Sequence, residues 1–115
     1  MIEYYDKNTK TLIIPHRFSE ELKDIPEETE IIIFSENKAK NECSIFNQPV
    51  DNLPKNLTHL TFGYEFNQPV DNLPKTLTHL SFGSCFNQSL NKLPENLIFL
   101  KLGLNFQQDV ILPQK

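Results

Sequence analysis

The sequence predicts a solenoid of stacked repeats that form one parallel β-sheet, with extended or 3₁₀ return segments and little α-helix. The first observation is self-similarity: residues 46–65 and 66–85 are identical at 16 of 20 positions, so the period is 20 residues. The second is that apolar and other residues alternate at the end of each unit, as in a half-buried strand. The third is a pair of prolines in the rest of the unit, which deny helical hydrogen bonds there. One strand and one non-helical return per repeat are therefore expected.

The N-terminal residues 1–17 are expected to cap the stack. Residues 2–5 and 11–14 are rich in β-branched and aromatic side chains, and they flank the polar, turn-like residues 6–10. This pattern is typical of a β-hairpin. We expect the hairpin to cover the first turn of the solenoid.

Residues 18–45 are expected to form a degenerate first repeat that contains an insert. Phe18 and Phe34 have the spacing of the two phenylalanines in the later repeats, but Phe18 lies 28 positions before Phe46 instead of 20. The extra residues include the polar run 36–42, which predicts a surface loop.

The remaining repeats extend the single repeat domain to residue 115. They are expected at residues 46–65, 66–85 and 86–105, followed by a truncated C-terminal repeat at 106–115. With the degenerate repeat, they predict four parallel strands, near residues 30–34, 58–62, 78–82 and 98–102. Stacking should place equivalent apolar residues in core ladders: Phe46/Phe66/Phe86/Phe106, Val50/Val70/Leu90, Leu53/Leu73/Leu93, Leu57/Leu77/Leu97, Leu60/Leu80/Leu100 and Phe62/Phe82/Leu102.

The Leu-x-x-Leu-x-Leu spacing of the strand segments predicts a leucine-rich-repeat solenoid. In addition, Phe-Asn-Gln-Pro-Val followed by Leu-Pro-Lys-x-Leu-Thr-His-Leu-x-Phe-Gly, present at residues 46–63 and 66–83, closely resembles the FNIP repeat. That family is a leucine-rich-repeat variant found chiefly in social amoebae and in large DNA viruses that infect amoebae. The resemblance covers about residues 46–110, and it implies a cytoplasmic location, in the host if the protein is viral. Some members carry an N-terminal F-box, but the stretch before Phe18 is too short for one.

The composition argues against several classes of partner. Eleven basic and fifteen acidic side chains give a net charge of −4, and Lys and Arg do not cluster, so nucleic acid is not expected as a partner. The longest apolar run, residues 31–34, is far shorter than the roughly 20 residues that cross a membrane. Cys43 and Cys85 are predicted to be free thiols.

Two histidines are candidates for a metal or catalytic site. His59 and His79 should lie on adjacent strands, about 4.8 Å apart. The equivalent positions of the flanking repeats are Ile31 and Phe99, however, and a catalytic zinc usually has three protein ligands. A metal site or a hydrolase that uses these histidines and Cys85 is a remote alternative. We expect no catalytic residue, no metal and no cofactor, and hence no enzyme.

The function expected is a non-enzymatic protein–protein interaction module. If Ile32 and Phe34 lie in the core, the alternate residues of each strand face outward. They form a row with apolar ends and one full charge, which suits contact with an as yet unidentified protein partner. The alternative is structural self-assembly, as a dimer or an end-to-end stack, through the C-terminal end of the solenoid. The residues expected to bind the partner are Ile31, Ile33, His59, Thr61, His79, Ser81, Phe99 and Lys101.

Overall fold

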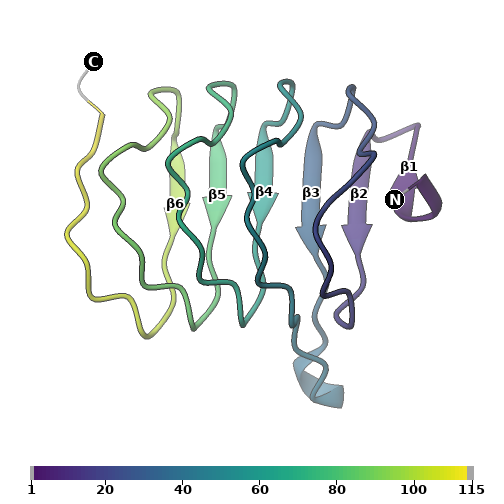
Figure 1. The fold of residues 1–115 in the computed structure, drawn as a ribbon, viewed down its shortest axis with the longest axis horizontal. Coiled ribbons are helices and arrows are strands. Elements are labelled where there is room, and N and C mark those ends of the chain that lie inside the picture. The colour runs from purple at the N-terminus through teal and green to yellow at the C-terminus, as the bar shows by residue number, and fades with distance from the viewer. Residues whose placement is uncertain (1, 114–115) are drawn as a thin grey trace.

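The structure is a computed structural model that describes residues 2–113. Six strands form one sheet in the order of the sequence, side by side in Figure 1. The sheet is one wall of a flat solenoid of 38 × 31 × 21 Å, which confirms the predicted fold class. The strands are β1 (Tyr5–Asp6), β2 (Thr11–Ile14), β3 (Ile31–Phe34), β4 (His59–Thr61), β5 (His79–Ser81) and β6 (Phe99–Lys101).

Strands β3 to β6 pair in parallel with equivalent positions opposed. Ile32 lies opposite Leu60, Leu60 opposite Leu80, and Leu80 opposite Leu100. The register predicted from the repeat is therefore confirmed. It is strongly determined, because a shift of one residue would turn the apolar side chains of every strand toward solvent.

The sheet contains five parallel strands, one more than predicted. The N-terminal hairpin is present, since β1 pairs with β2 antiparallel, but β2 also pairs in parallel with β3. Its Leu12 lies opposite Ile32 and its Ile14 opposite Phe34, each 20 residues further along the chain. The hairpin is therefore joined to the stack through a complete strand of the solenoid.

The first arm of that hairpin is shorter than predicted. Only two residues form β1, and residues 2–4 form a 3₁₀ turn, η1 (Ile2–Tyr4). The side chains of Tyr4 and Tyr5 pack against the core. The turn leading to β2 is closed by a hydrogen bond from the Asn8 amide to the Asp6 carboxylate, 2.9 Å long. The short arm thus covers the first turn of the solenoid.

Within residues 2–113 the return segments contain no helix, as predicted from their prolines. In the second repeat, the Leu57 amide donates to the carbonyl of Pro54 over 3.3 Å, which closes a tight turn just before β4. In the next repeat, the Leu77 amide makes the equivalent bond to Pro74, 3.2 Å long. Each proline thus ends a return segment and positions the leucine that enters the core.

The core is one continuous cluster in which the predicted ladders stack. The phenylalanine that starts each repeat packs on its equivalent in the next: the ring centroids of Phe46 and Phe66 are 6.0 Å apart, and those of Phe66 and Phe86 are 6.2 Å apart. The phenylalanine that follows each strand fills the space between, since the ring of Phe62 lies 3.7 Å from that of Phe66. Aromatic pairs of this kind add stabilisation beyond the area they bury.

A ladder of asparagines holds the return segments together. The side-chain oxygen of Asn47 accepts the amide of Asn67 at 2.8 Å, and that of Asn67 accepts the amide of Asn87 at 2.9 Å. The neighbouring glutamines add a second row, because Gln68 and Gln88 also donate to these asparagine oxygens. Backbone groups that a helix would have paired internally are thus satisfied by the adjacent turn.

The insert after β3 is a surface loop, as predicted, and it projects from the lower edge of Figure 1. Its tip is a 3₁₀ turn, η2 (Lys38–Lys40), and a bridge between Asn37 and Glu42 closes its base. Glu36 attaches the loop to the solenoid, because its carboxylate accepts the amides of Ser44 at 2.8 Å and of Tyr64 at 2.7 Å. No helix among residues 2–113 is long and apolar enough to cross a membrane.

Candidate interaction face

The eight residues predicted to bind a partner lie on one face of the sheet, in two neighbouring lines that cross four strands. Together they are here called the outward row. Ile31 lies opposite His59, His59 opposite His79, and His79 opposite Phe99. A second line runs beside it, from Ile33 through Thr61 and Ser81 to Lys101. The structure therefore brings all eight residues together on one face of the sheet, by backbone pairing alone.

The outward row is open to solvent, most of all at its C-terminal end. Phe99 is 48% exposed and Lys101 is exposed, whereas His59 and His79 are half-buried. The inward residues of the same strands are closed off, since Leu60 and Leu80 are at most 1% exposed. The face thus presents a partly desolvated centre and an exposed aromatic ring at one end.

Three rings stack along the centre of the outward row. The imidazoles of His59 and His79 have centroids 4.1 Å apart and planes inclined by 10°. The ring of Phe99 continues the stack, with its centroid 5.8 Å from that of His79. The parallel register produces this arrangement, because it places equivalent side chains one strand spacing apart.

A threonine before each histidine contacts the ring and holds its orientation. The hydroxyl of Thr58 lies 3.1 Å from the carbonyl of Glu30 and 2.8 Å from Nδ1 of His59. Thr78 repeats both contacts with Thr58 and His79, at 3.1 and 2.9 Å. Each imidazole is therefore held at Nδ1 by the hydroxyl that precedes it in the chain.

The environment of the stack favours the neutral form of His59. Burial lowers its pKa below the usual value of 6.5, and the adjacent His79 lowers it further through charge repulsion. The folded structure thus holds an imidazole at the centre of the face in its uncharged form over a wider range of pH than a free imidazole has.

One strand of this face, β2, was not predicted from the sequence as part of it. Thr11 lies opposite Ile31, and Ile13 lies opposite Ile33, so β2 lengthens the outward row toward the N-terminus. Ile13 is 50% exposed and adds an apolar side chain at that end. The signal was present in the sequence, because residues 11–14 lie exactly one period before β3.

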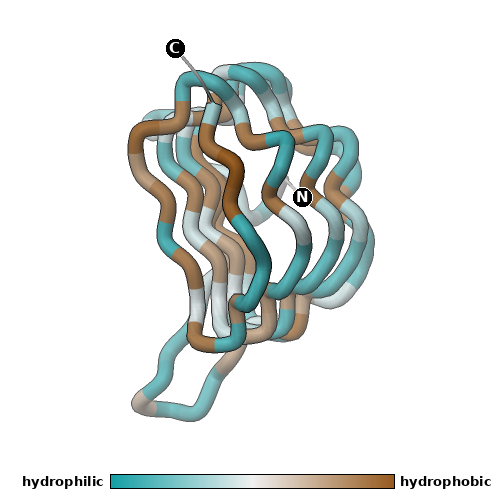
Figure 2. Tube along the Cα trace, turned by 90° about the vertical axis from the view of Figure 1, so that its left-hand side faces the viewer, coloured by the Kyte–Doolittle hydropathy of each residue, from teal (hydrophilic) through white to brown (hydrophobic). Residues whose placement is uncertain are grey.

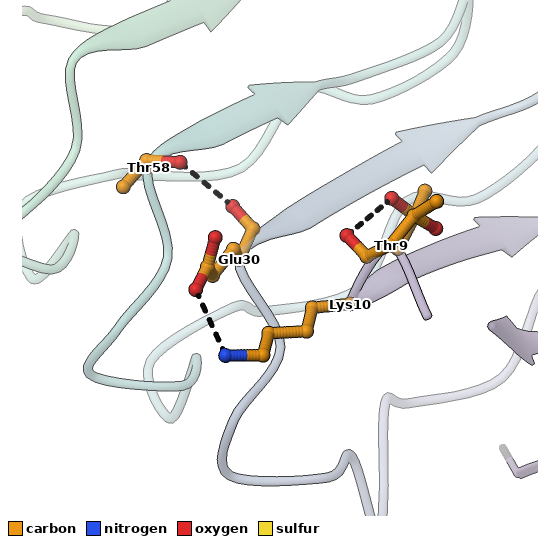
Figure 3. A network of polar contacts seen from close by, with 5 residues as sticks. Thr9, Lys10, Glu30 and Thr58 are labelled. Atoms are coloured by element: carbon orange, nitrogen blue, oxygen red, sulfur yellow. Dashed lines mark hydrogen bonds and ion pairs between the residues drawn. The ribbon is translucent and has the colours of Figure 1, made fainter. Parts of the chain in front are cut away.

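Polar contacts border the face where β2, β3 and β4 begin (Figure 3). The ammonium of Lys10 lies 3.4 Å from the carboxylate of Glu30, and the carbonyl of Glu30 accepts the hydroxyl of Thr58. The ion pair is exposed, since its side chains are 48% and 45% accessible, so its contribution to stability is small. It neutralises a lysine and a glutamate at the margin of the apolar row.

The described residues contain no cluster suited to a metal. Among residues 2–113, no three His, Cys, Asp or Glu side chains are grouped so that they could hold an ion. The stacked pair of His59 and His79 has Ile31 and Phe99 on either side. Cys43 and Cys85 are half-buried free thiols. The feature that distinguishes this surface is its shape and apolar character.

The fold defines the class of protein: a leucine-rich-repeat solenoid of about five turns with a parallel sheet. Residues 46–85, which hold two of the repeats, match a known family that is described as FNIP Repeat. The resemblance found in the sequence is therefore confirmed for these residues.

A solved structure is also similar to this chain. It is that of CroV588, described as a novel circular LRR protein, with a TM-score of 0.61 and 42% sequence identity over 74% of this chain. The chain spans 12% of the length of CroV588, so the likeness concerns the repeats and not the whole of that protein. No curated protein matches the chain.

Proposed function

We propose that the chain is a non-enzymatic interaction module that binds a protein partner through the outward row. The observation that carries this proposal is the continuous stack of His59, His79 and Phe99 on the exposed face of a regular sheet. A rigid aromatic surface has little conformational entropy to lose on binding. The repeat fold supports the proposal, because solenoids present extended surfaces of this kind to other proteins.

The chemistry of the row indicates what the partner offers. Apolar side chains stand at both ends, with Ile13 at one and Phe99 at the other, and Lys101 is the full charge among the eight residues. Interface centres are typically depleted of charge and enriched in aromatic residues. The two imidazoles in the middle can form hydrogen bonds through Nε2, so we propose a partner surface with apolar groups at its edges and polar groups between them.

The test is a comparison of captured proteins. The wild-type chain and the Phe99→Ala variant are immobilised and exposed to extract of the source cell, with Tyr64→Ala as the matched control. Tyr64 is 43% exposed, close to the 48% of Phe99, but it lies outside the row. An anchoring aromatic contributes more than about 1 kcal/mol, so the partner's affinity should fall at least about fivefold for Phe99→Ala alone.

Two results would contradict this proposal. One is an unchanged affinity of the identified partner for Phe99→Ala. The other is equal loss with Tyr64→Ala, which would assign binding to a different surface. Thermal unfolding of both variants should stay close to that of the wild type, because both rings are substantially exposed.

A further inference from the structure

The C-terminal end of the stack is unusually apolar. Ile98 stands where the two preceding repeats have threonine, and Leu104 stands where they have hydroxyl-bearing residues. Ile98 is 71% exposed and Leu104 is 93% exposed. Solenoid ends that face water normally carry polar residues. These changes at the last complete repeat, residues 86–105 and its strand, therefore indicate a surface that is covered when the protein acts.

The shape of this end is a step. Residues 106–113, here called the tail, continue the return layer: Phe106 stacks on Phe86 with centroids 6.0 Å apart, and Val110 forms a bridge with Leu90. Within residues 2–113 no strand pairs with the outer edge of β6. The return layer thus extends beyond the sheet layer, as the leftmost part of Figure 1 shows.

Both surfaces of the step are apolar. On the sheet side, Leu97, Leu100 and Leu102 are only partly buried, although their equivalents in the preceding repeat are buried. On the projecting side, Ile111 is 60% exposed and Leu112 is 66% exposed. Figure 2, which looks onto this end, shows hydrophobic segments along both parts of the front turn.

We propose that this end binds a second copy of the chain, with the tail of each copy seated against β6 of the other. A two-fold axis parallel to the strands exchanges the sheet layer and the return layer, so each projecting tail fills the step of its partner. In Figure 1 the tail runs opposite to β6, and this rotation preserves that direction. The tail therefore adds to β6 as an antiparallel strand, and its backbone pairs with the open edge.

The arrangement closes at two copies. The other end of the stack is covered, because β1 pairs with β2 and the rings of Tyr4 and Tyr5 pack against the core. The free edge at that end is β1, which is two residues long, so among the described residues β6 offers the longer open strand edge. An interface in which each copy contributes the same two surfaces is isologous, so it gives a dimer and not a filament.

The test uses two double variants whose side chains are exposed. The tail variant carries Ile111→Asp and Leu112→Asp, and the edge variant carries Ile98→Lys and Leu104→Lys. Each should weaken self-association at least tenfold, measured by sedimentation equilibrium over a range of concentrations. An equimolar mixture of the two should restore a dimer, because an acidic tail then meets a basic edge and the other contact stays wild type. The control Ile13→Asp, at the far end of the sheet, should dimerise as the wild type does.

Several outcomes would overturn the proposal. They are a wild-type chain that remains monomeric at several hundred micromolar, open-ended assembly, a tail variant that still dimerises fully, and a mixture of folded variants that stays monomeric. Circular dichroism melting shows whether each variant is folded before it is scored. None of the four substituted positions belongs to the outward row, so loss of the dimer and loss of partner binding are distinguishable.

Discussion

His59 makes the stability of the folded chain depend on pH. Its Nδ1 is hydrogen-bonded to the hydroxyl of Thr58, its ring stacks on His79, and its pKa is lowered by burial and by that neighbour. In the unfolded chain the same imidazole would protonate near pH 6.5. The folded state therefore disfavours a proton that the unfolded state accepts.

This difference predicts a loss of stability in mild acid. Because the unfolded state binds the proton more readily, stability contributed by the neutral ring is complete above about pH 6.5 and declines as the pH falls toward the lower folded pKa. His59→Gln removes the titrating group, so its free energy of unfolding should fall less between pH 7.5 and 5.5 than that of the wild type. Urea unfolding at both pH values measures this, and equal losses would contradict it.

Gly83 is constrained by the backbone of the preceding turn. A Cβ atom built on Gly83 would overlap the carbonyl of Gly63, and one on Gly103 would overlap that of Gly83. The obstacle is main chain, which cannot rotate away as a flexible side chain can. These glycines therefore allow successive turns to approach closely, without needing a left-handed conformation.

The Gly83→Ala substitution should accordingly destabilise the protein by about 1–3 kcal/mol, as overpacking does. The neighbouring Ser84→Ala change should cost about 0.5 kcal/mol or less, because it adds no atom at the contact between turns. Chemical unfolding of the two variants provides the comparison. Equal stability of both would show that the turns can separate freely.

Among the elements, the strands differ in how completely the stack covers them. Leu80 in β5 is fully buried between β4 and β6, whereas Leu100 in β6 is only partly buried. A cavity at Leu80 is bounded on all sides, so Leu80→Ala should cost about 2–5 kcal/mol. Leu100→Ala should cost less, because solvent already borders the site. Thermal unfolding of the two variants should rank them in that order.

The predictability of the elements follows from their periodicity. Strands β3 to β6 were predicted in the correct register because apolar residues alternate around Ile32, Leu60, Leu80 and Leu100 at equivalent positions. Strand β2 was predicted only as a hairpin arm, since residues 11–14 satisfy both patterns and the segment between β2 and β3 keeps only part of the repeat motif. The pairing on its second side is a tertiary choice that local sequence does not specify.

The outward row was also predictable only in part. Its eight members were predictable, because the two-residue alternation of a strand decides which side chains face outward. The bonds from Thr58 and Thr78 to the histidine rings were not, because ring orientation depends on side-chain rotamers and on the carbonyl of the adjacent strand. The extension through Ile13 was missed together with β2.

At the scale of the whole molecule, the solenoid is a one-dimensional stack in which each turn contacts its neighbours. Strand β4 is paired on both sides, and β6 on one. Amide hydrogen exchange in dilute solution should therefore be slower in β4 than in β6. Raising the protein concentration should slow exchange in β6 selectively if that edge pairs between copies. Uniform exchange across the sheet would contradict this gradient.

The attachment of the insert has a consequence for how this architecture can vary. Glu36 binds the backbone of Ser44 at the end of the loop and of Tyr64 in the next turn, and a bridge between Asn37 and Glu42 closes the loop base. The solenoid therefore does not depend on the residues at the tip, and closing a longer loop costs only about 0.6 kcal/mol per doubling of its length. The tip at residues 38–40 is thus a natural position for grafting a foreign peptide or a new recognition loop, and the stacked turns would act as its display scaffold.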